Sequence, residues 1–288
     1  MNCHTFARRL PDGRQHLQHG PIDLIIEAWG EADAVAEAYH RAARRFETVL
    51  TELVAELPLL RGLDAAPTGV MARRMARAVA PFRPAFITPM AAVAGSVAEE
   101  ILAALVGPGI VKAYVNNGGD IAVHLGPGQR LTCAMIEGQG ALTLSDRDAA
   151  RGIASSGWGG RSWSFGIADA VTVVARTAAM ADAAATMIAN AVDLPGHPAV
   201  TRCPANTLQA DTDLGDRLVT TAVGPLSGAD IARALDAGLG TADAFRARGL
   251  IDAAALFLHS ACRVTGPLFP GPPFPAADFL PAPEPAHV

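Results

Sequence analysis

The sequence predicts one globular chain in which β-strands and α-helices are both abundant. Three observations support this prediction. Half of the 288 residues are hydrophobic, which is enough for a sizeable core. Short β-branched and apolar runs are bounded by Gly, Pro and Asn, as strands commonly are. Between these runs lie stretches whose apolar residues recur with the 3.6-residue period of a helix.

Composition and charge exclude several classes of function. The net charge is -5 and the basic residues are not gathered into one strong cluster, so no nucleic-acid partner is expected. The four cysteines form no CxxC pair, and buried thiols in a reducing compartment are the expectation. The sequence shows neither an apolar N-terminal segment nor an apolar run of membrane-spanning length. We therefore expect a cytoplasmic protein with no membrane partner.

The N-terminal third predicts a hairpin followed by two helices. Residues 5–29 predict a β-hairpin, with a polar strand, the turn Pro11-Asp12-Gly13, and an apolar strand that starts at Ile22-Asp-Leu-Ile-Ile26 and continues to Trp29. Residues 31–57 carry a helical apolar rhythm that ends before Pro58. Residues 69–80 predict a second, shorter helix. These elements carry no residue pattern that indicates chemistry.

Small residues begin the next helix, and a glycine-rich turn comes after it. Residues 90–106 start with Met-Ala-Ala-Val-Ala-Gly-Ser, which allows close approach of either a neighbouring element or a ligand. Strands are predicted at 110–115 and 121–125, joined by Asn116-Asn-Gly-Gly-Asp120. Asn and Gly favour a hairpin turn there, and the same glycines expose backbone N–H groups to an anion or a flat ring.

A second small-residue region lies at 152–192. Strands at 131–137, 141–144 and 152–157 precede a loop and the buried strand 171–174. The helix after that strand places Asp182 and Thr186 one turn apart on one face. Their oxygens suit a hard cation such as Mg²⁺. The alternative is structural: Asp182 interacts with a helix dipole and Thr186 bonds back to a carbonyl.

The C-terminal third predicts fewer regular elements. The chain is expected to be irregular after Pro195, with a strand at 217–223, a helix at 229–235 capped by Ser227, and β structure at 251–264. We expect a single domain over residues 1–266, with two subdomains possible within it. Residues 267–288 are rich in proline and predict an extended or disordered tail.

Taken together, the motifs of residues 85–192 resemble the ApbE superfamily, whose best-known members are FAD:protein FMN transferases. Ala91-Ala-Val-Ala-Gly-Ser96 is similar to the family's small-residue helix start, and Asn117-Gly-Gly-Asp-Ile121 to its Gly-Gly-Asp turn. Ser155-Ser-Gly157 resembles its Ser-Gly turn. The strand 171–174 resembles the family's T-V-V strand, and the helix segment Ala181-Asp-Ala-Ala-Ala-Thr186 resembles its A-D-A-x-A-T helix.

The resemblance implies an α+β fold, ApbE-like and T-fold-like, with mixed sheets, packed helices and a ligand cleft between subdomains. It implies FAD as substrate or ligand, and Mg²⁺ held by Asp182, Thr186 and the carbonyl of Ala92. By the same resemblance, catalysis falls to Asp182, with Asp169 as a partial substitute for a family histidine. The residues implied to bind the flavin nucleotide are Ala92, Asn117, Gly118, Gly119, Asp120, Ser155, Ser156 and Gly157.

The chain departs from the transferases at two places. Gly95 stands where the family has a lysine, and the short loop from Trp158 to Asp169 replaces a histidine-containing segment. The pattern is closer to a shorter ApbE-related branch of unassigned function. The resemblance leaves two functions open: Mg²⁺-dependent pyrophosphate cleavage or FMN transfer to an acceptor protein, or non-catalytic binding of a flavin or pterin-like cofactor. A homodimer is the commonest expectation for a soluble oligomer.

Overall fold

The computed structural model describes residues 5–63, 66–134 and 141–267. The proline-rich tail and part of the predicted strand 131–137 lie outside these residues. One nine-stranded sheet forms the centre of the molecule, in the spatial order β1-β2-β3-β4-β5-β8-β9-β12-β13. Its strands are β1 Phe6–Arg9, β2 Gln15–His19, β3 Ile22–Gly30, β4 Ile110–Asn117, β5 Asp120–Leu125, β8 Gly152–Ser156, β9 Ala170–Ala175, β12 Ala253–Leu258 and β13 Ala261–Thr265. Every pairing between described strands is antiparallel.

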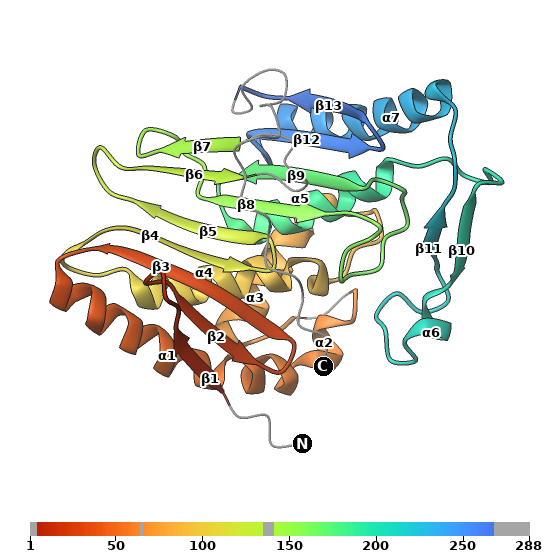
Figure 1. The fold of residues 1–288 in the computed structure, drawn as a ribbon. Helices are drawn as coiled ribbons and strands as arrows, with labels where there is room; N and C mark the ends of the chain where they lie inside the picture. The colour runs from red at the N-terminus through yellow and green to blue at the C-terminus, as the bar shows by residue number, and fades with distance from the viewer. Residues whose placement is uncertain (1–4, 64–65, 135–140, 268–288) are drawn as a thin grey trace.

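The helices cover one face of this sheet (Figure 1). Those helices are α1 Ala32–Ala55, α2 Leu57–Leu60, α3 Val70–Val79, α4 Val93–Leu105, α5 Ala178–Ala191 and α7 Gly228–Ala247, with 3₁₀ turns η1 Ala80–Phe82 and η2 Pro89–Ala92. The central pair is α4, which lies on β4 and β5, and α5, which lies on β8 and β9. The fold is thus α+β, as expected.

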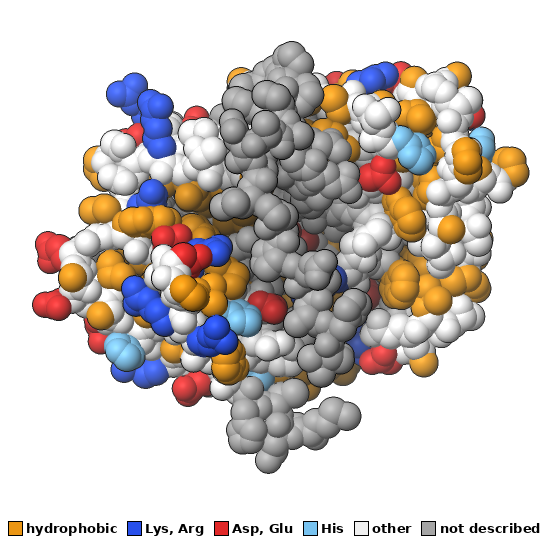
Figure 2. Space-filling model, viewed as in Figure 1, with side chains coloured by type: hydrophobic (Ala, Val, Ile, Leu, Met, Phe, Trp, Pro, Cys, Tyr) orange, Lys and Arg blue, Asp and Glu red, His pale blue; other side chains and the backbone are white. Residues whose placement is uncertain are grey.

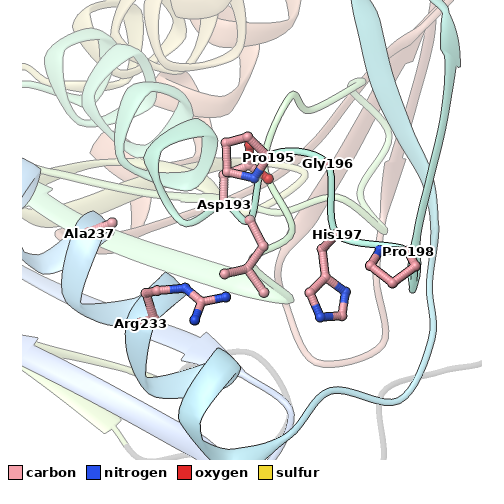
Figure 3. A pocket seen from close by; sticks show the side chains of 8 residues that line it. Asp193, Pro195, Gly196, His197, Pro198, Arg233 and Ala237 are labelled. Atoms are coloured by element: carbon pink, nitrogen blue, oxygen red, sulfur yellow. The ribbon is translucent and has the colours of Figure 1, made fainter.

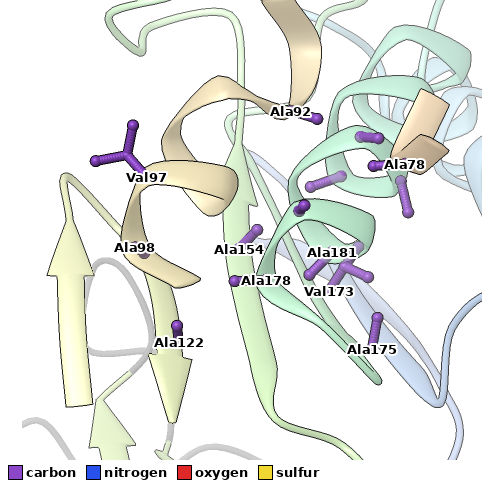
Figure 4. Packing of buried hydrophobic residues seen from close by; sticks show 14 of the residues in the cluster. Ala78, Ala92, Val97, Ala98, Ala122, Ala154, Val173, Ala175, Ala178 and Ala181 are labelled. Atoms are coloured by element: carbon purple, nitrogen blue, oxygen red, sulfur yellow. The ribbon is translucent and has the colours of Figure 1, made fainter. Parts of the chain in front are cut away.

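Alanine makes the close packing of the central helices possible. Figure 4 shows Ala92 and Ala98 of the α4 region and Ala178 and Ala181 of α5, which belong to the apolar cluster between the helices and the strands. All four are fully buried. Small side chains bring helix and sheet backbones close together, so that polar groups at the helix ends can reach the strands. This closeness positions the candidate site.

The opposite face of the sheet is partly covered by a hairpin. Strands β6 Arg130–Ala134 and β7 Ala141–Ser145 form a separate two-stranded sheet. Leu131, Leu142 and Leu144 from this hairpin pack with Val123 and Ile153 of the central sheet in a second apolar cluster. Side chains alternate across a strand, which is why one strand contributes to both clusters.

The third sheet projects beyond the edge of the helical layer (Figure 1). It consists of β10 Val200–Pro204 and β11 Leu218–Val223, with the short α6 Ala205–Leu208 between them. Apolar side chains gather on this part of the surface in Figure 2, and Leu208 and Leu218 are exposed there. Among the described residues, no helix combines the length and the apolar character needed to cross a membrane.

The structure corrects three sequence expectations. Residues 5–29 do not form a two-stranded hairpin, because β1, β2 and β3 are three separate strands and the turn at Pro11–Gly13 joins only β1 to β2. The chain after Pro195 is not irregular, because β10 and α6 follow within a few residues. The helix capped by Ser227 does not end at Leu235 but runs to Ala247. Gly238 and Gly240 weaken its helical pattern in the sequence, and packing against β12 and β13 overrides that propensity.

Candidate functional site

The N-termini of α4 and α5 meet at Gly95. A Cβ atom on Gly95 would lie 2.3 Å from the carbonyl oxygen of Ala178, so only glycine allows this approach. Asp182, in the second turn of α5, reaches across and accepts a hydrogen bond from the backbone N–H of Gly95 at 3.0 Å. No side chain within α4 caps its own start. The expected interaction of Asp182 with a helix dipole is therefore present, but it involves the neighbouring helix.

The glycine-rich turn between β4 and β5 is attached to the same helix start. The side-chain amide of Asn117 donates to the carbonyl of Ala94 at 3.1 Å. The backbone N–H of Gly119 donates to the side-chain oxygen of Asn116 at 2.8 Å, which closes the turn. Gly118 and Gly119 have φ of +65° and +108°, where side chains are strained. The hairpin prediction is confirmed by the pairing of Asn117 with Asp120.

Asp120 and Asp182 are neighbouring carboxyl groups, of which Asp120 is buried and Asp182 is half-buried. Burial raises the pKa of Asp182 to about 7, although the N–H groups of Gly95 and Ala94 oppose the shift. Burial also raises the pKa of Asp120 well above its usual range, and the charge of Asp182 adds to that shift. The Oδ1 atom of Asp120 is buried without a hydrogen-bond partner among the described residues. This pair needs protons or a cation to balance its charge.

The other two predicted cation ligands, Thr186 and Ala92, lie on α5 and at the start of α4. Thr186 is one turn beyond Asp182 on α5 and is only partly buried. Within the described chain its hydroxyl forms no hydrogen bond, so the predicted back-bonding to a carbonyl is not seen. Ala92 is the residue at the N-cap of α4, three residues before Gly95. The structure thus brings Asp182, Thr186, Ala92, Asn117 and Asp120 to one region.

The Ser-Gly turn lies at the end of β8 and borders a cavity. The backbone N–H of Ser155 lowers the pKa of Asp120, and the Ser155 hydroxyl is 2.9 Å from that of Thr172. A cavity of about 220 Å³ opens between the central sheet and the β6–β7 hairpin. Its lining consists of Asn116, Gly119, Ile121, Cys133, Ala134, Leu142, Ile153, Ser155 and Thr172. Ser156 and Gly157 continue the same strand end.

Asp169 occupies a different environment from the carboxyl pair. Its side chain accepts hydrogen bonds from the indole N–H of Trp158 at 3.0 Å and from the backbone N–H of His259. Its backbone N–H donates to the carbonyl of Phe257. One carboxylate oxygen thus joins the two ends of the 158–169 loop, and the other joins the loop to the residue after β12. Catalysis by Asp169 stays a prediction that these contacts do not favour.

Sequence reasoning missed one residue beside the glycine turn. The guanidinium of Arg161 lies against Gly118, where an added Cβ would be 1.9 Å from its Nη2 atom. Its charge opposes the raised pKa of Asp120. Arg161 stands in a loop of Gly, Ser and Trp with no periodic pattern. No local signal could have placed it, because the contact joins residues far apart in the chain.

A larger cavity of about 460 Å³ lies away from these groups. Figure 3 shows the turn from Asp193 to Pro198 facing Arg233 and Ala237 of α7. Its charged side chains are paired: Arg202 with Asp193, and Arg233 with Asp230 at 2.7 Å. Size alone would favour this cavity, but its charged groups are already compensated by one another.

The chain as a whole matches one protein family. The model of the family described as "AbpE bacteria" matches residues 7–264. The chain therefore belongs to this family, which confirms the resemblance drawn from the motifs.

Curated relatives match over shorter segments. A UPF0280 protein of Methanothermobacter thermautotrophicus is 40% identical over 132 residues, which are 44% of this chain and 50% of the relative. One from Archaeoglobus fulgidus is 41% identical over 106 residues, or 37% of this chain and 45% of the relative. One from Methanothrix thermoacetophila is 38% identical over 159 residues, or 50% and 64%. The chain thus spans about half the length of the curated relatives it matches.

Two solved structures are similar over most of the chain. One is the apo form of flavinyl transferase ApbE from Pseudomonas stutzeri, with a TM-score of 0.43, 12% identity and coverage of 92% of this chain and 94% of that chain. The other is a mutant of flavin transferase ApbE from Vibrio cholerae, with a TM-score of 0.37, 11% identity and coverage of 92% and 97%.

Proposed function

We propose that this chain binds FAD or a related nucleotide together with Mg²⁺. It then either cleaves the nucleotide pyrophosphate or transfers FMN from it to an acceptor. The observation that carries the proposal is the Asp120–Asp182 pair, whose charge the surrounding protein compensates only in part. Membership in the matched family supports the choice of a flavin nucleotide.

The residues present fit a hard divalent cation. Asp182 and Asp120 supply carboxylate oxygens, and Thr186 supplies a hydroxyl that the described chain leaves unused. No group of three or more His, Cys, Asp or Glu in the described residues could hold a metal. A site of two carboxylates completed by hydroxyl, carbonyl and ligand oxygens suits Mg²⁺, which is commonly bound by one or two carboxylates plus phosphates. When bound, such an ion supplies Lewis-acid stabilisation of charge on the pyrophosphate.

The turn from Asn116 to Asp120 links the carboxyl pair with the cavity under the β6–β7 hairpin. Asp120 lies beside Asp182, whereas its neighbour Gly119 lines the cavity. The cavity has apolar walls from Ile121, Leu142 and Ile153 and polar groups at Ser155 and Thr172. Such a lining suits part of a flat, ring-bearing ligand. A nucleotide that crosses the turn would therefore place its charged portion beside the carboxyl pair and its apolar portion in the cavity.

The chemistry proposed is a single displacement at phosphorus. A hydroxyl oxygen from water or from an acceptor protein bonds to the FMN phosphorus. The bond from that phosphorus to the bridging oxygen breaks, AMP leaves with that oxygen, and the hydroxyl proton passes to solvent. The chain's contribution is to orient the pyrophosphate. Asn117 and Asp182 fix the helix start and the glycine turn against each other, so both sides of the site keep their spacing.

One observation favours the non-catalytic alternative, a flavin or pterin-like cofactor-binding or assembly accessory protein. The position matching the family lysine is Gly95, and the carbonyl of Ala178 occupies the space of any side chain there. The only lysine, Lys112, lies over the ring of Trp29 at 3.9 Å and serves a different part of the fold. Binding without turnover would use the same carboxyl pair.

Titration of the purified protein with FAD, with and without Mg²⁺, tests both functions. We expect tighter binding with Mg²⁺, release of AMP, and loss of both effects in Asp182→Asn. Asp236→Asn is the matched control, because Asp236 is exposed and pairs with Arg263. Binding with FAD left intact would select the accessory function. Absence of binding by the unmodified chain would overturn both. An acceptor protein, a homodimer and a cytoplasmic location remain predictions.

A further inference from the structure

Arg161 extends from the loop after β8 to the glycine turn and lies over Gly118. Its Nη2 and Cζ atoms would be 1.9 Å and 2.9 Å from a Cβ on Gly118. Gly118 also has φ of +65°. Two independent features therefore require glycine here: the backbone conformation and the space that the guanidinium occupies.

The guanidinium of Arg161 acts on Asp120 through its charge but has no bonded partner in the described chain. Within residues 5–63, 66–134 and 141–267, its guanidinium forms no ion pair and donates no hydrogen bond, and its side chain is exposed. Other arginines near the helices are engaged. Arg74 pairs with Glu99 and Glu100 and donates to the carbonyl of Ser96. Arg217 lies over the ring of Phe86. Arg161 thus presents a planar set of donors that have no acceptor in the described chain.

The position of this cation indicates what it can bind. Arg161 faces Asp120, whose Oδ1 atom is buried without a partner among the described residues. Yet the two groups form no ion pair of the kind seen between Arg74 and Glu100. A ligand between them would have to satisfy both a guanidinium and a carboxylate pair. A phosphate group with a bound cation would do so, because phosphate oxygens accept hydrogen bonds from arginine and the carboxylates would hold the cation.

We propose that Arg161 binds a phosphate oxygen of the ligand and makes the site select phosphorylated flavins over riboflavin. This proposal rests on the proposed function, since it assigns a contact within the same nucleotide site. At Gly119 the nearest atom to an added Cβ is 4.0 Å away, which leaves room for the phosphate to approach the backbone, and Arg161 contacts it from the side of the 158–169 loop. Arg161 is a binding residue and has no proton-transfer role.

Binding of FAD, FMN and riboflavin to Arg161→Gln, with Mg²⁺ present, tests this proposal. A hydrogen bond between charged groups corresponds to roughly a tenfold to hundredfold change in Kd. We expect the Kd for FAD and FMN to rise by about that factor while the Kd for riboflavin stays constant. Arg161→Lys should keep part of the preference, because the charge remains but the planar geometry is lost. Arg147→Gln, at an exposed arginine after β7, is the control.

The outcomes separate this proposal from the proposed function. If Arg161→Gln binds all three flavins as tightly as the unmodified chain, FAD binding stands and the role of Arg161 is wrong. An equal loss of affinity for riboflavin and FMN would indicate that Arg161 has a structural role, and this result would also overturn the proposal. If the unmodified chain binds none of the three, the proposed function fails and the Arg161 contact fails with it.

Discussion

Two regions of the molecule carry charged groups beside a cavity, and they differ in how that charge is balanced. The cavity at 193–198 is larger, but the two charged side chains that line it, Asp193 and Arg233, are paired with Arg202 and Asp230. The region of the glycine turn borders a smaller cavity and contains Asp120 and Asp182, which form no ion pair among the described residues. The Ser227 hydroxyl and the charge of Arg233 lower the pKa of Asp230, whereas burial raises that of Asp120.

We therefore rank the two regions as candidate sites by how far their charges are compensated and not by cavity volume. A group whose partners lie within the chain adds to stability and leaves nothing for a ligand. A buried group without partners lowers stability until a ligand or proton supplies them. Substitutions in the two regions and changes of pH test this difference.

Gly95→Ala should be the most disruptive single substitution. Its Cβ would contact the carbonyl group of Ala178 and the nitrogen of Ala179, which are backbone atoms that cannot move aside separately. We expect a loss of about 3 kcal/mol or more in the free energy of unfolding, at the upper end for overpacking. Urea denaturation measures it. Gly240→Ala on α7, where no atom lies within 4 Å, should instead add up to about 1 kcal/mol. Equal effects at both positions would contradict the close contact of α4 and α5.

The unfolding free energy of the cation-free protein should decrease as pH rises from about 4 to about 7. The pKa of Asp182 is raised from 3.8 to about 7, so in this range the folded state binds more protons than the unfolded state. Stability is then greatest below the unfolded pKa and is lost as pH rises through the folded one. The expected loss is on the order of 2 to 4 kcal/mol. Urea denaturation at several pH values measures it, and Asp182→Asn should flatten the curve. An unfolding free energy that rises between pH 4 and pH 7 would contradict the raised pKa of Asp182.

Asp120→Asn should stabilise the cation-free protein at pH 8. The substitution removes one of two neighbouring charges and keeps the size of the side chain, and we expect a gain of about 1 to 2 kcal/mol. Asp230→Asn should lower stability instead, because Ser227 and Arg233 favour the charged carboxylate there. Thermal unfolding of both variants gives the signs. A loss of stability in Asp120→Asn would mean that the protein compensates the charge of Asp120 as it does that of Asp230.

Arg233→Gln should have the smallest effect. Its side chain is largely exposed and its ion pair with Asp230 lies at the surface, where such pairs contribute little. We expect the melting temperature to change by no more than about 1 °C. A larger decrease would mean that the cavity at 193–198 depends on this pair more than its exposure indicates.

Much of the local structure could be predicted from the sequence. The period of apolar residues located α1 and α3, and Asn-Asn-Gly-Gly-Asp located the β4–β5 turn, because these signals are local. The full length of α7 and the presence of β10 escaped prediction. Their stability comes from packing against distant segments, which no short window of sequence contains.

For the candidate site, the sequence by itself identified the candidate residues: Asp182 and Thr186, spaced one turn apart on one helix, and Asp120 at the end of a glycine turn. Only the tertiary structure decided that Asp182 caps α4, that Asp120 lies beside it, and that Arg161 reaches Gly118. The physical reason is burial. A carboxyl group has a raised pKa or an unsatisfied atom only through neighbours brought together by folding, and small side chains at α4 and α5 let them come that close.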